Sequence, residues 1–223
     1  MTSRPIFSQE LLRLSTQRST DLALLVLFER IAAAILLLFF IPLLALLSAA
    51  IFLMSGQAPV IGDRRVGLNG RPFWMFKLRT MWTKNHAKEY RFRWIEYLKA
   101  PVKRERKLAA DPRVTSAFAA FCRRHSIDEL VQLWHVAKGE MSLVGPRPVT
   151  ALELHQHYGL DAREVLSMRP GLSGLWQVTG RSRLSYSQRK RLDLRLVRNY
   201  SASLYLAILR RTAWHLLKGD SAW

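Results

Sequence analysis

The sequence predicts a mostly α-helical protein with a small β-hairpin, in which an N-terminal membrane helix precedes a helix-rich cytoplasmic domain. Three observations lead to this fold class. Residues 31–54 form an uncharged, almost wholly apolar run, which is long enough to cross a bilayer. Two short segments that could form strands flank the Gly-Leu-Asn-Gly sequence at 67–70, a pattern typical of a β-hairpin. Residues 203–218 are amphipathic, which suits a lipid interface or a protein core equally.

The charge of the chain points to anionic partners. The chain has 223 residues, with 35 Lys+Arg against 16 Asp+Glu and a formal net charge of +19. Such an excess favours nucleic acid, acidic lipid head groups or phosphorylated substrates. Cys122 is the single cysteine, so an intrachain disulfide is excluded.

Composition divides the chain into three regions. We predict a short leader at 1–27, a membrane-embedded helix at 28–58 and a cytoplasmic domain at 59–223. The apolar run starts too late and is too long for a signal peptide. Positive charges gather after it, between Arg64 and Arg79, which places the C-terminal side in the cytoplasm.

Pro42 lies near the middle of the apolar run. Because proline removes a backbone donor and clashes with the preceding turn, it kinks or breaks a helix. The helix either spans the membrane with a kink or turns back within one leaflet. Hydropathy alone favours spanning.

The elements after the membrane helix follow from turn residues and apolar spacing. Val60–Val66 and Pro72–Leu78 are predicted strands. Helices are predicted near 83–110, 114–124, 127–137, 151–168, 185–199 and 203–218, with an irregular Gly-rich stretch at 169–182. The very basic 83–110 segment suits either an anionic membrane surface or a solvated helix face.

Asp128 and Glu129 stand side by side at a predicted helix start. Ser126 with Glu129 three positions later matches a capping box, which is one interpretation. The other is functional: an aspartate can attack phosphorus, and Mg²⁺ binds through few carboxylates plus substrate phosphates. A helix N-terminus also favours a nearby phosphate.

Basic residues near special backbone strengthen the phosphate interpretation. Arg123 precedes the acidic pair, Arg147 stands between two prolines, Arg181 follows a glycine, and Lys77 ends the second strand. Guanidinium groups bind phosphate bidentately. Taken singly, each of these residues is better explained as a surface or ion-pair side chain.

The chain carries, in order, motifs that resemble those of the bacterial sugar transferase family. The resemblance covers roughly residues 28–223. It rests on Glu29-Arg30, Arg65-Val66-Gly67-Leu68-Asn69-Gly70, Lys77-Leu78-Arg79-Thr80-Met81, Asp111-Pro112-Arg113-Val114-Thr115, Asp128-Glu129-Leu130, Leu143-Val144-Gly145-Pro146-Arg147-Pro148, Arg169-Pro170-Gly171-Leu172-Ser173-Gly174 and Gln177-Val178-Thr179-Gly180-Arg181. Each block is weak alone, whereas the ordered set is specific.

The resemblance implies a reaction and a location. A phosphoglycosyltransferase of this kind moves a sugar phosphate from a UDP-sugar to undecaprenyl phosphate and releases UMP, an early membrane step of polysaccharide synthesis such as exopolysaccharide biosynthesis. Asp128 would be the nucleophile, and Glu129 with Asp128 would hold Mg²⁺. Lys77, Arg123, Arg147 and Arg181 would bind phosphate.

The same resemblance bears on topology and partners. It implies a re-entrant, Pro-broken membrane helix, so that the protein is monotopic on the cytoplasmic face of the bacterial inner membrane. Membrane lipid is an expected partner, a homodimer is expected weakly, and nucleic acid is not expected.

This chain departs from the family pattern at several positions. The family usually has Lys at Glu29, Pro at Val131, Asn at His135, Asp at Glu140 and Tyr at Leu196. We expect the minimal catalytic form of the family, because the chain does not carry the large N-terminal membrane region of some relatives.

Two other hypotheses compete with an enzyme. A membrane-tethered basic protein could bind anionic lipid or nucleic acid without catalysis, although the chain carries no nucleic-acid motif. A silent relative could act as a scaffold, against which the intact Asp128 and Glu129 count.

Overall fold

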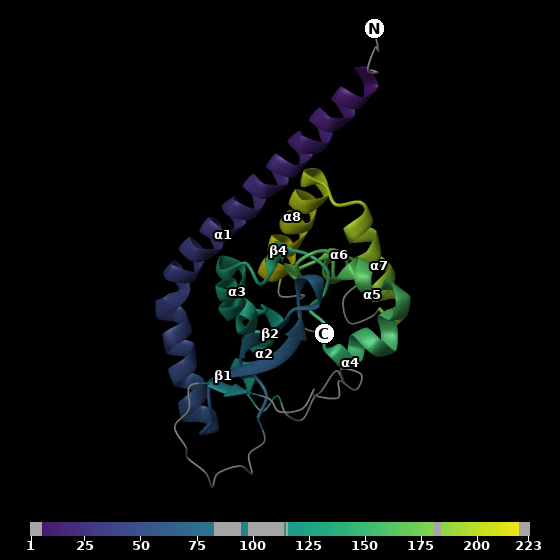
Figure 1. The fold of residues 1–223 in the computed structure, drawn as a ribbon. Coiled ribbons are helices and arrows are strands. Elements are labelled where there is room, and N and C mark those ends of the chain that lie inside the picture. Colours follow the sequence, from purple (N-terminus) through teal and green to yellow (C-terminus); the bar gives the residue numbers. More distant parts are fainter. Residues whose placement is uncertain (1–5, 83–94, 98–113, 115, 181–183, 219–223) are drawn as a thin grey trace.

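One long helix lies along a domain of short helices and two small sheets (Figure 1). The computed structural model describes residues 6–82, 95–97, 114, 116–180 and 184–218. Helix α1 runs from Ile6 to Ser55. The mostly helical class with a small hairpin is therefore confirmed.

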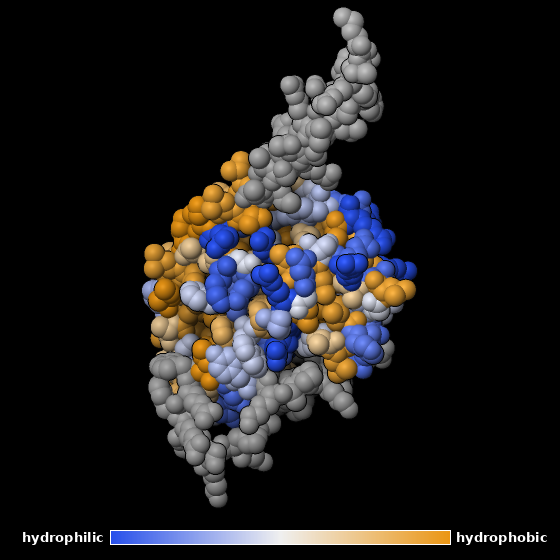
Figure 2. Space-filling view, viewed as in Figure 1, coloured by the Kyte–Doolittle hydropathy of each residue, from blue (hydrophilic) through white to orange (hydrophobic). Residues whose placement is uncertain are grey.

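Helix α1 is continuous through Pro42 and changes direction part-way along its length (Figure 1). It begins inside the region expected to be a separate leader, 1–27. The stretch Leu24–Ser55 is long and apolar enough to cross a membrane by length and composition. Hydrophobic surface gathers on the flank where α1 lies (Figure 2), and it includes the exposed side chains of Leu38, Phe39 and Leu53. Re-entrance of this helix stays a prediction.

The predicted hairpin is confirmed. Strand β1 (Val60–Val66) pairs antiparallel with β2 (Pro72–Leu78). The turn between them contains Asn69 at φ 53, a left-handed conformation that asparagine tolerates better than most residues. The short strand β3 (Ile95–Tyr97) adds to β1 in parallel and gives the order β2-β1-β3.

Strand β3 corrects one expectation. A helix was predicted over 83–110, but 95–97 are a strand, and the rest of that segment lies outside the described residues. Ile95, Glu96 and Tyr97 pair with β1, so long-range strand pairing prevails over the local helical pattern.

The acidic pair lies in a chain segment of mixed helix type. Helix α2 (Ala117–Arg124) is followed by the 3₁₀ segment η2 (Ile127–Gln132) and then by α3 (Leu133–Lys138). One helix had been predicted over 127–137. Gly139 ends α3 at φ 81, close to the predicted helix end at 137.

Two backbone segments of the C-terminal half approach each other closely. Strands β4 (Ser142–Val144) and β5 (Gly171–Ser173) pair in parallel. A Cβ at Gly145 would overlap the Arg169 carbonyl, so glycine is required where these two segments meet.

Short helices and two longer ones complete the domain. They are α4 (Ala151–Glu153), the π-helical η3 (Leu154–Tyr158), the 3₁₀ segment η4 (Gly159–Asp161), α5 (Ala162–Val165), α6 (Leu175–Thr179), α7 (Tyr186–Arg198) and α8 (Ala202–Lys218). The predicted helix 151–168 is interrupted at Gly159, where φ is 52. The predicted irregular stretch 169–182 contains β5 and α6. Helices α7 and α8 agree with the predicted 185–199 and 203–218.

A buried carboxylate joins α1 to the domain. Glu29 is 3% exposed. It accepts hydrogen bonds from Ser142 Oγ at 2.7 Å, the Leu143 amide at 3.2 Å and the Tyr205 hydroxyl at 2.6 Å. Next to it, Arg30 Nε donates to the Ala137 carbonyl at the end of α3 (3.0 Å). One turn of α1 is therefore bonded to α3, β4 and α8.

We predict that Glu29→Ala lowers the Tm of the detergent-purified protein by roughly 5 °C or more, because buried donors left unpaired cost about 1–3 kcal/mol. The Tm of Glu29→Gln, which keeps an acceptor oxygen, should fall by less than that of Glu29→Ala. Thermal unfolding checks both, with Leu38→Ala on the exposed side of α1 as the control. An equal loss in Glu29→Ala and Leu38→Ala would contradict the anchoring role.

Candidate active site

Asp128 and Glu129 open the η2 segment, and they are not part of a capping box. Ser126 is left-handed at φ 54, and within the described residues its side chain makes no capping hydrogen bond. Its carbonyl instead accepts the Glu129 amide at 3.0 Å. The capping interpretation is therefore wrong, because Ser126 is left-handed and lacks the extended backbone of a residue that caps a helix with its side chain.

Lys77 reaches the acidic pair from the neighbouring strand. It is the penultimate residue of β2, and its ammonium group forms an ion pair and hydrogen bond with Glu129 Oε1. Both side chains are partly exposed. Two positions 52 residues apart in sequence, both predicted as site residues, are thus in contact.

The Asp128 carboxyl lies in an electrostatic environment of opposing charges. Burial and then the negative charge of Glu129 raise its pKa to about 6, while Lys77 and Arg123 act in the opposite direction. At neutral pH the carboxylate is therefore mostly ionised although it is buried. A partly desolvated carboxylate between two cations is suited to attack an electrophilic phosphorus.

Arg147 belongs to a second cationic cluster. Its guanidinium lies 5.2 Å from the centre of the Trp176 ring, and Arg189 lies 5.1 Å from the same ring. Glu153 is 3.6 Å from Arg147. Burial, and then the charge of Arg147, lower the pKa of Arg189. Arg189 and Trp176 were not among the predicted site residues.

Asp193 fixes the backbone of Arg147. Its fully buried carboxylate accepts the Arg147 amide at 3.2 Å and the Tyr158 hydroxyl at 2.8 Å. With prolines on both sides, the backbone at Arg147 is held in one shape. The sequence signal for this contact was weak, because a lone aspartate in a helix usually indicates an ion pair.

The hairpin connects the two clusters. Arg65 on β1 is almost fully buried and pairs with Asp63 and with Glu153, the latter at 3.1 Å. It also donates to the Pro148 carbonyl at 3.1 Å. The hairpin thus presents Lys77 to η2 and holds the loop that carries Arg147. Arg181 lies outside the described residues.

The donor set at η2 fits Mg²⁺ bound jointly with a ligand. No group of three His, Cys, Asp or Glu side chains gathers among the described residues. Asp128 and Glu129 alone supply adjacent carboxylates. Mg²⁺ commonly binds through one or two carboxylates plus substrate phosphates, so two acidic side chains are enough.

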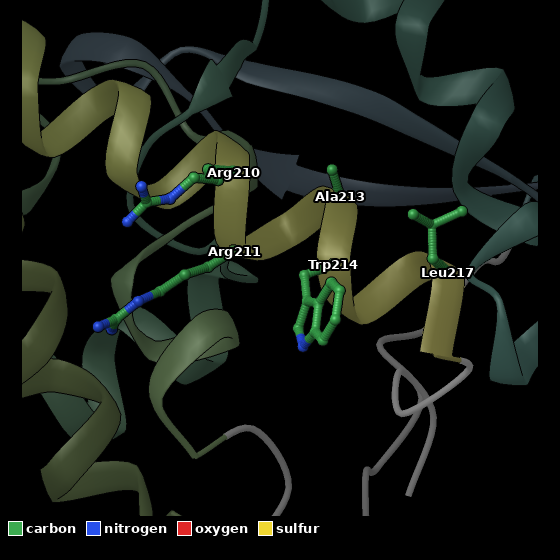
Figure 3. Close-up of a pocket in the computed structure, with 5 residues that line it drawn as sticks. All are labelled: Arg210, Arg211, Ala213, Trp214 and Leu217. Atoms are coloured by element: carbon green, nitrogen blue, oxygen red, sulfur yellow. The ribbon is translucent and has the colours of Figure 1, made fainter.

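Helix α8 carries a separate surface hollow of about 390 Å³, lined by Arg210, Arg211, Ala213, Trp214 and Leu217. Arg210 and Arg211 extend to the same side of the helix (Figure 3). The Lys218 ammonium lies 4.6 Å from the Trp214 ring centre. This combination of apolar side chains and cations suits an interfacial helix.

The sequence of this chain is similar to a family model and to several known proteins. A family model described as bacterial sugar transferase matches residues 21–219. The chain is 40% identical over 199 residues to a UDP-galactose-lipid carrier transferase of Erwinia amylovora, which covers 88% of this chain but 41% of that protein. It is 41% identical over 186 residues to the exopolysaccharide production protein ExoY of Rhizobium meliloti, covering 83% of this chain and 81% of the relative.

A third relative has a more specific name. It is a UDP-glucose:undecaprenyl-phosphate glucose-1-phosphate transferase of Caulobacter vibrioides, 36% identical over 201 residues, with 86% of this chain and 69% of the relative covered. The chain thus spans most of two of these relatives and under half of the Erwinia protein.

We predict that Asp128→Asn stabilises the protein at pH 8. The folded pKa of about 6 lies above the ordinary 3.8, so the ionised carboxylate disfavours folding by roughly 2–3 kcal/mol above pH 6, a cost that disappears as pH falls towards 3.8. The Tm of Asp128→Asn should exceed that of the wild type by roughly 5 °C at pH 8 and by little at pH 4.

Asp193→Asn is the matched control for this experiment. The pKa of Asp193 is likewise raised to about 6 by burial, but both its oxygens accept hydrogen bonds. An amide replaces one of these acceptors with a donor, so this variant should lose stability at both pH values. A lower Tm of Asp128→Asn at pH 8 would contradict the prediction.

Proposed function

This chain belongs to the bacterial sugar transferase family, and we propose that it transfers a sugar 1-phosphate from a UDP-sugar to undecaprenyl phosphate and releases UMP. The observation that carries the proposal is the contact of Lys77 with Glu129 beside the buried Asp128, with Arg123 acting on the same carboxyl. The Caulobacter relative is named for a UDP-sugar and undecaprenyl phosphate, and the Erwinia relative for a UDP-sugar and a lipid carrier.

The reaction has two displacement steps. The Asp128 carboxylate attacks the sugar-bearing phosphorus, a phosphorus–oxygen bond to the bridging oxygen breaks, and UMP leaves. A phosphate oxygen of undecaprenyl phosphate then attacks the same phosphorus, and the bond to Asp128 breaks to regenerate the carboxylate. The products are undecaprenyl-diphosphate-sugar and UMP, and Asp128 is unchanged after the cycle.

Cations offset the charge that gathers on the phosphates. Glu129, with Asp128 as a second carboxylate, would hold Mg²⁺, which supplies neutralisation of phosphate charge when bound. Lys77 and Arg123 lie at the acidic pair. Arg147, in the cluster with Trp176, and Arg181 are the further phosphate-binding residues of the proposal.

The packing of α1 supports a monotopic arrangement. Ala33 packs with Met75 and Val136, and Ile51 packs with Leu78 and Cys122. The helix therefore stays in contact with the domain from one end of its apolar run to the other. A helix crossing the whole bilayer would have to take these domain contacts into the hydrocarbon, where polar groups are costly. We propose re-entrance from the cytoplasmic face of the inner membrane, with the turning region of α1 near Pro42.

We predict that Asp128→Asn abolishes transfer. Purified protein with Mg²⁺, undecaprenyl phosphate and a panel of UDP-sugars should release UMP only when the lipid is present, and the variant should be slower by at least about 10³-fold because the nucleophile is missing. Mass spectrometry of the wild type without acceptor lipid should show a sugar-phosphate adduct on the peptide that contains Asp128.

Asp161→Asn is the control, because Asp161 pairs with Lys190 away from η2 (2.6 Å). It should retain activity. An active wild-type protein without the adduct would reject the covalent step, whereas salt-sensitive binding of anionic lipid or DNA without turnover of any UDP-sugar would favour the non-catalytic alternative.

Re-entrance predicts that tags at both termini are accessible only from the cytoplasm. In spheroplasts, an impermeant thiol reagent should leave a cysteine added at either terminus unlabelled, and it should label both after the membrane is opened. Cys122→Ala provides the background, since Cys122 is the single native cysteine. Labelling of the N-terminal cysteine in intact spheroplasts would reject the re-entrant arrangement.

A further inference from the structure

His135 joins β2, which carries Lys77, to α3, which directly follows the η2 segment with Asp128 and Glu129. It lies on α3 and is 1% exposed. Its Nε2 accepts the backbone N–H of Phe76 in β2 at 3.0 Å. Since β2 is at the edge of the three-stranded sheet, this N–H faces away from β1, and the imidazole takes the place that a further strand would occupy.

The hydrogen bonds of His135 define its tautomer. Because Nε2 accepts, the ring proton lies on Nδ1 and is donated to Glu140 Oε2 at 2.7 Å. Glu140 is held in turn by Lys138, whose Nζ donates to Oε1 at 2.7 Å. Burial lowers the pKa of His135, which favours this neutral form.

The surroundings of the ring leave it little freedom. The His135 ring centre lies 5.5 Å from that of Phe73 and 5.0 Å from that of Phe76, both on β2. Packing therefore holds the imidazole against the strand. The hydrogen bond to Glu140 fixes the orientation of the imidazole ring, so that Nε2 faces the Phe76 N–H.

The position of this bridge in the chain gives it a consequence. Lys77 directly follows Phe76, and Glu129 lies in the η2 segment that leads without interruption into α3. The His135–Phe76 hydrogen bond and the Lys77–Glu129 ion pair therefore both join β2 to the continuous η2–α3 segment, at adjacent residues of β2 and at two positions of η2–α3 that are six residues apart. The first contact limits how far β2 can slide along η2 and α3, and it thereby limits the second.

We propose that His135 is a positioning residue: its Nε2 holds the edge of β2 on α3 and thereby sets Lys77 against Glu129. Its effect on catalysis rests on the proposed function. Its effect on the Lys77–Glu129 contact does not, so the two can be tested separately.

Zero-length crosslinking tests the contact without any substrate. A water-soluble carbodiimide condenses the Lys77 amine with the Glu129 carboxylate, and mass spectrometry quantifies the crosslinked peptides. The partly exposed Lys190–Asp161 pair is the internal reference in each sample. Relative to it, His135→Phe, which keeps a ring but removes the acceptor, should lower the Lys77–Glu129 crosslink by about fivefold, because loss of one anchoring bond lets the pair separate. His135→Gln, which returns an acceptor oxygen, should restore most of it.

Kinetics of UMP release test the consequence for the reaction. Since misplacing a charged group mainly affects the chemical step, His135→Phe should lower kcat by about tenfold or more, with KM for the UDP-sugar changed less than about threefold. His135→Gln should recover most of kcat. Val136→Ala is the matched control, because Val136 is a fully buried core residue of the same helix. It should lower Tm as much as His135→Phe does and leave kcat within about twofold.

The outcomes separate the two proposals. An unchanged crosslink ratio in His135→Phe, a wild type without the Lys77–Glu129 crosslink, or a kcat loss no larger than in Val136→Ala would overturn the positioning role. A wild type that forms the crosslink but turns over no UDP-sugar would reject the proposed function and leave the crosslink result to decide the role of His135.

Discussion

The packing of an apolar helix along a highly charged domain is the constraint on which the structure depends. Helix α1 packs against the domain on one side and leaves apolar side chains uncovered on the other, so its surface is divided lengthwise, with Ala33 and Ile51 buried and Leu38 and Leu53 exposed. Glu29 stands just before this apolar run and is buried among donors from β4 and α8. A carboxylate with several donors is tolerated in an interior only while all of its partners stay in place. The contact therefore fixes both the angle of α1 and the position of β4, which leads directly to the loop that carries Arg147.

In the candidate active site, burial affects the charge of a carboxylate instead of anchoring a helix. Asp128 is held in a place that disfavours its charge, because burial and the neighbouring Glu129 outweigh the opposite effects of Lys77 and Arg123 on its pKa. A carboxylate that is well hydrated, or that accepts several hydrogen bonds, is a weak nucleophile because attack must first break those contacts. Burial of the ionised Asp128 carboxylate lowers the stability of the fold. The neighbouring cations keep most of this carboxylate ionised at neutral pH. Asp193 shows the contrast: it is as deeply buried, yet its two hydrogen bonds give it a structural role at Arg147.

Local signals in the sequence were enough for the elements whose cause is local. The Gly-Leu-Asn-Gly turn, the end of α3 at Gly139 and the amphipathic α7 and α8 lie where turn chemistry and apolar spacing predicted. The acidic pair was also identified, but its assignment to a capping box failed because the left-handed Ser126 is set by the join between α2 and η2. Strand β3, the stacking of Arg189 on Trp176 and the reach of His135 to Phe76 all depend on partners distant in the chain, and periodicity carries no information about such partners.

Several positions at which this sequence is expected to differ from the family pattern lie in buried contacts. His135 and Glu140 are hydrogen-bonded to each other, so a change at either position affects the partner of the other. Glu29 is a departure that would leave a buried charge without compensation if β4 and Tyr205 did not supply donors. Leu196, where a tyrosine is usual, is fully buried beside the same Tyr205. None of these changes touches Asp128, Glu129, Lys77 or Arg123. The contacts of Glu29, His135 and Glu140 therefore support the elements on which the site charges lie, so a change at one of these positions can alter the geometry of the charges without altering the charges themselves.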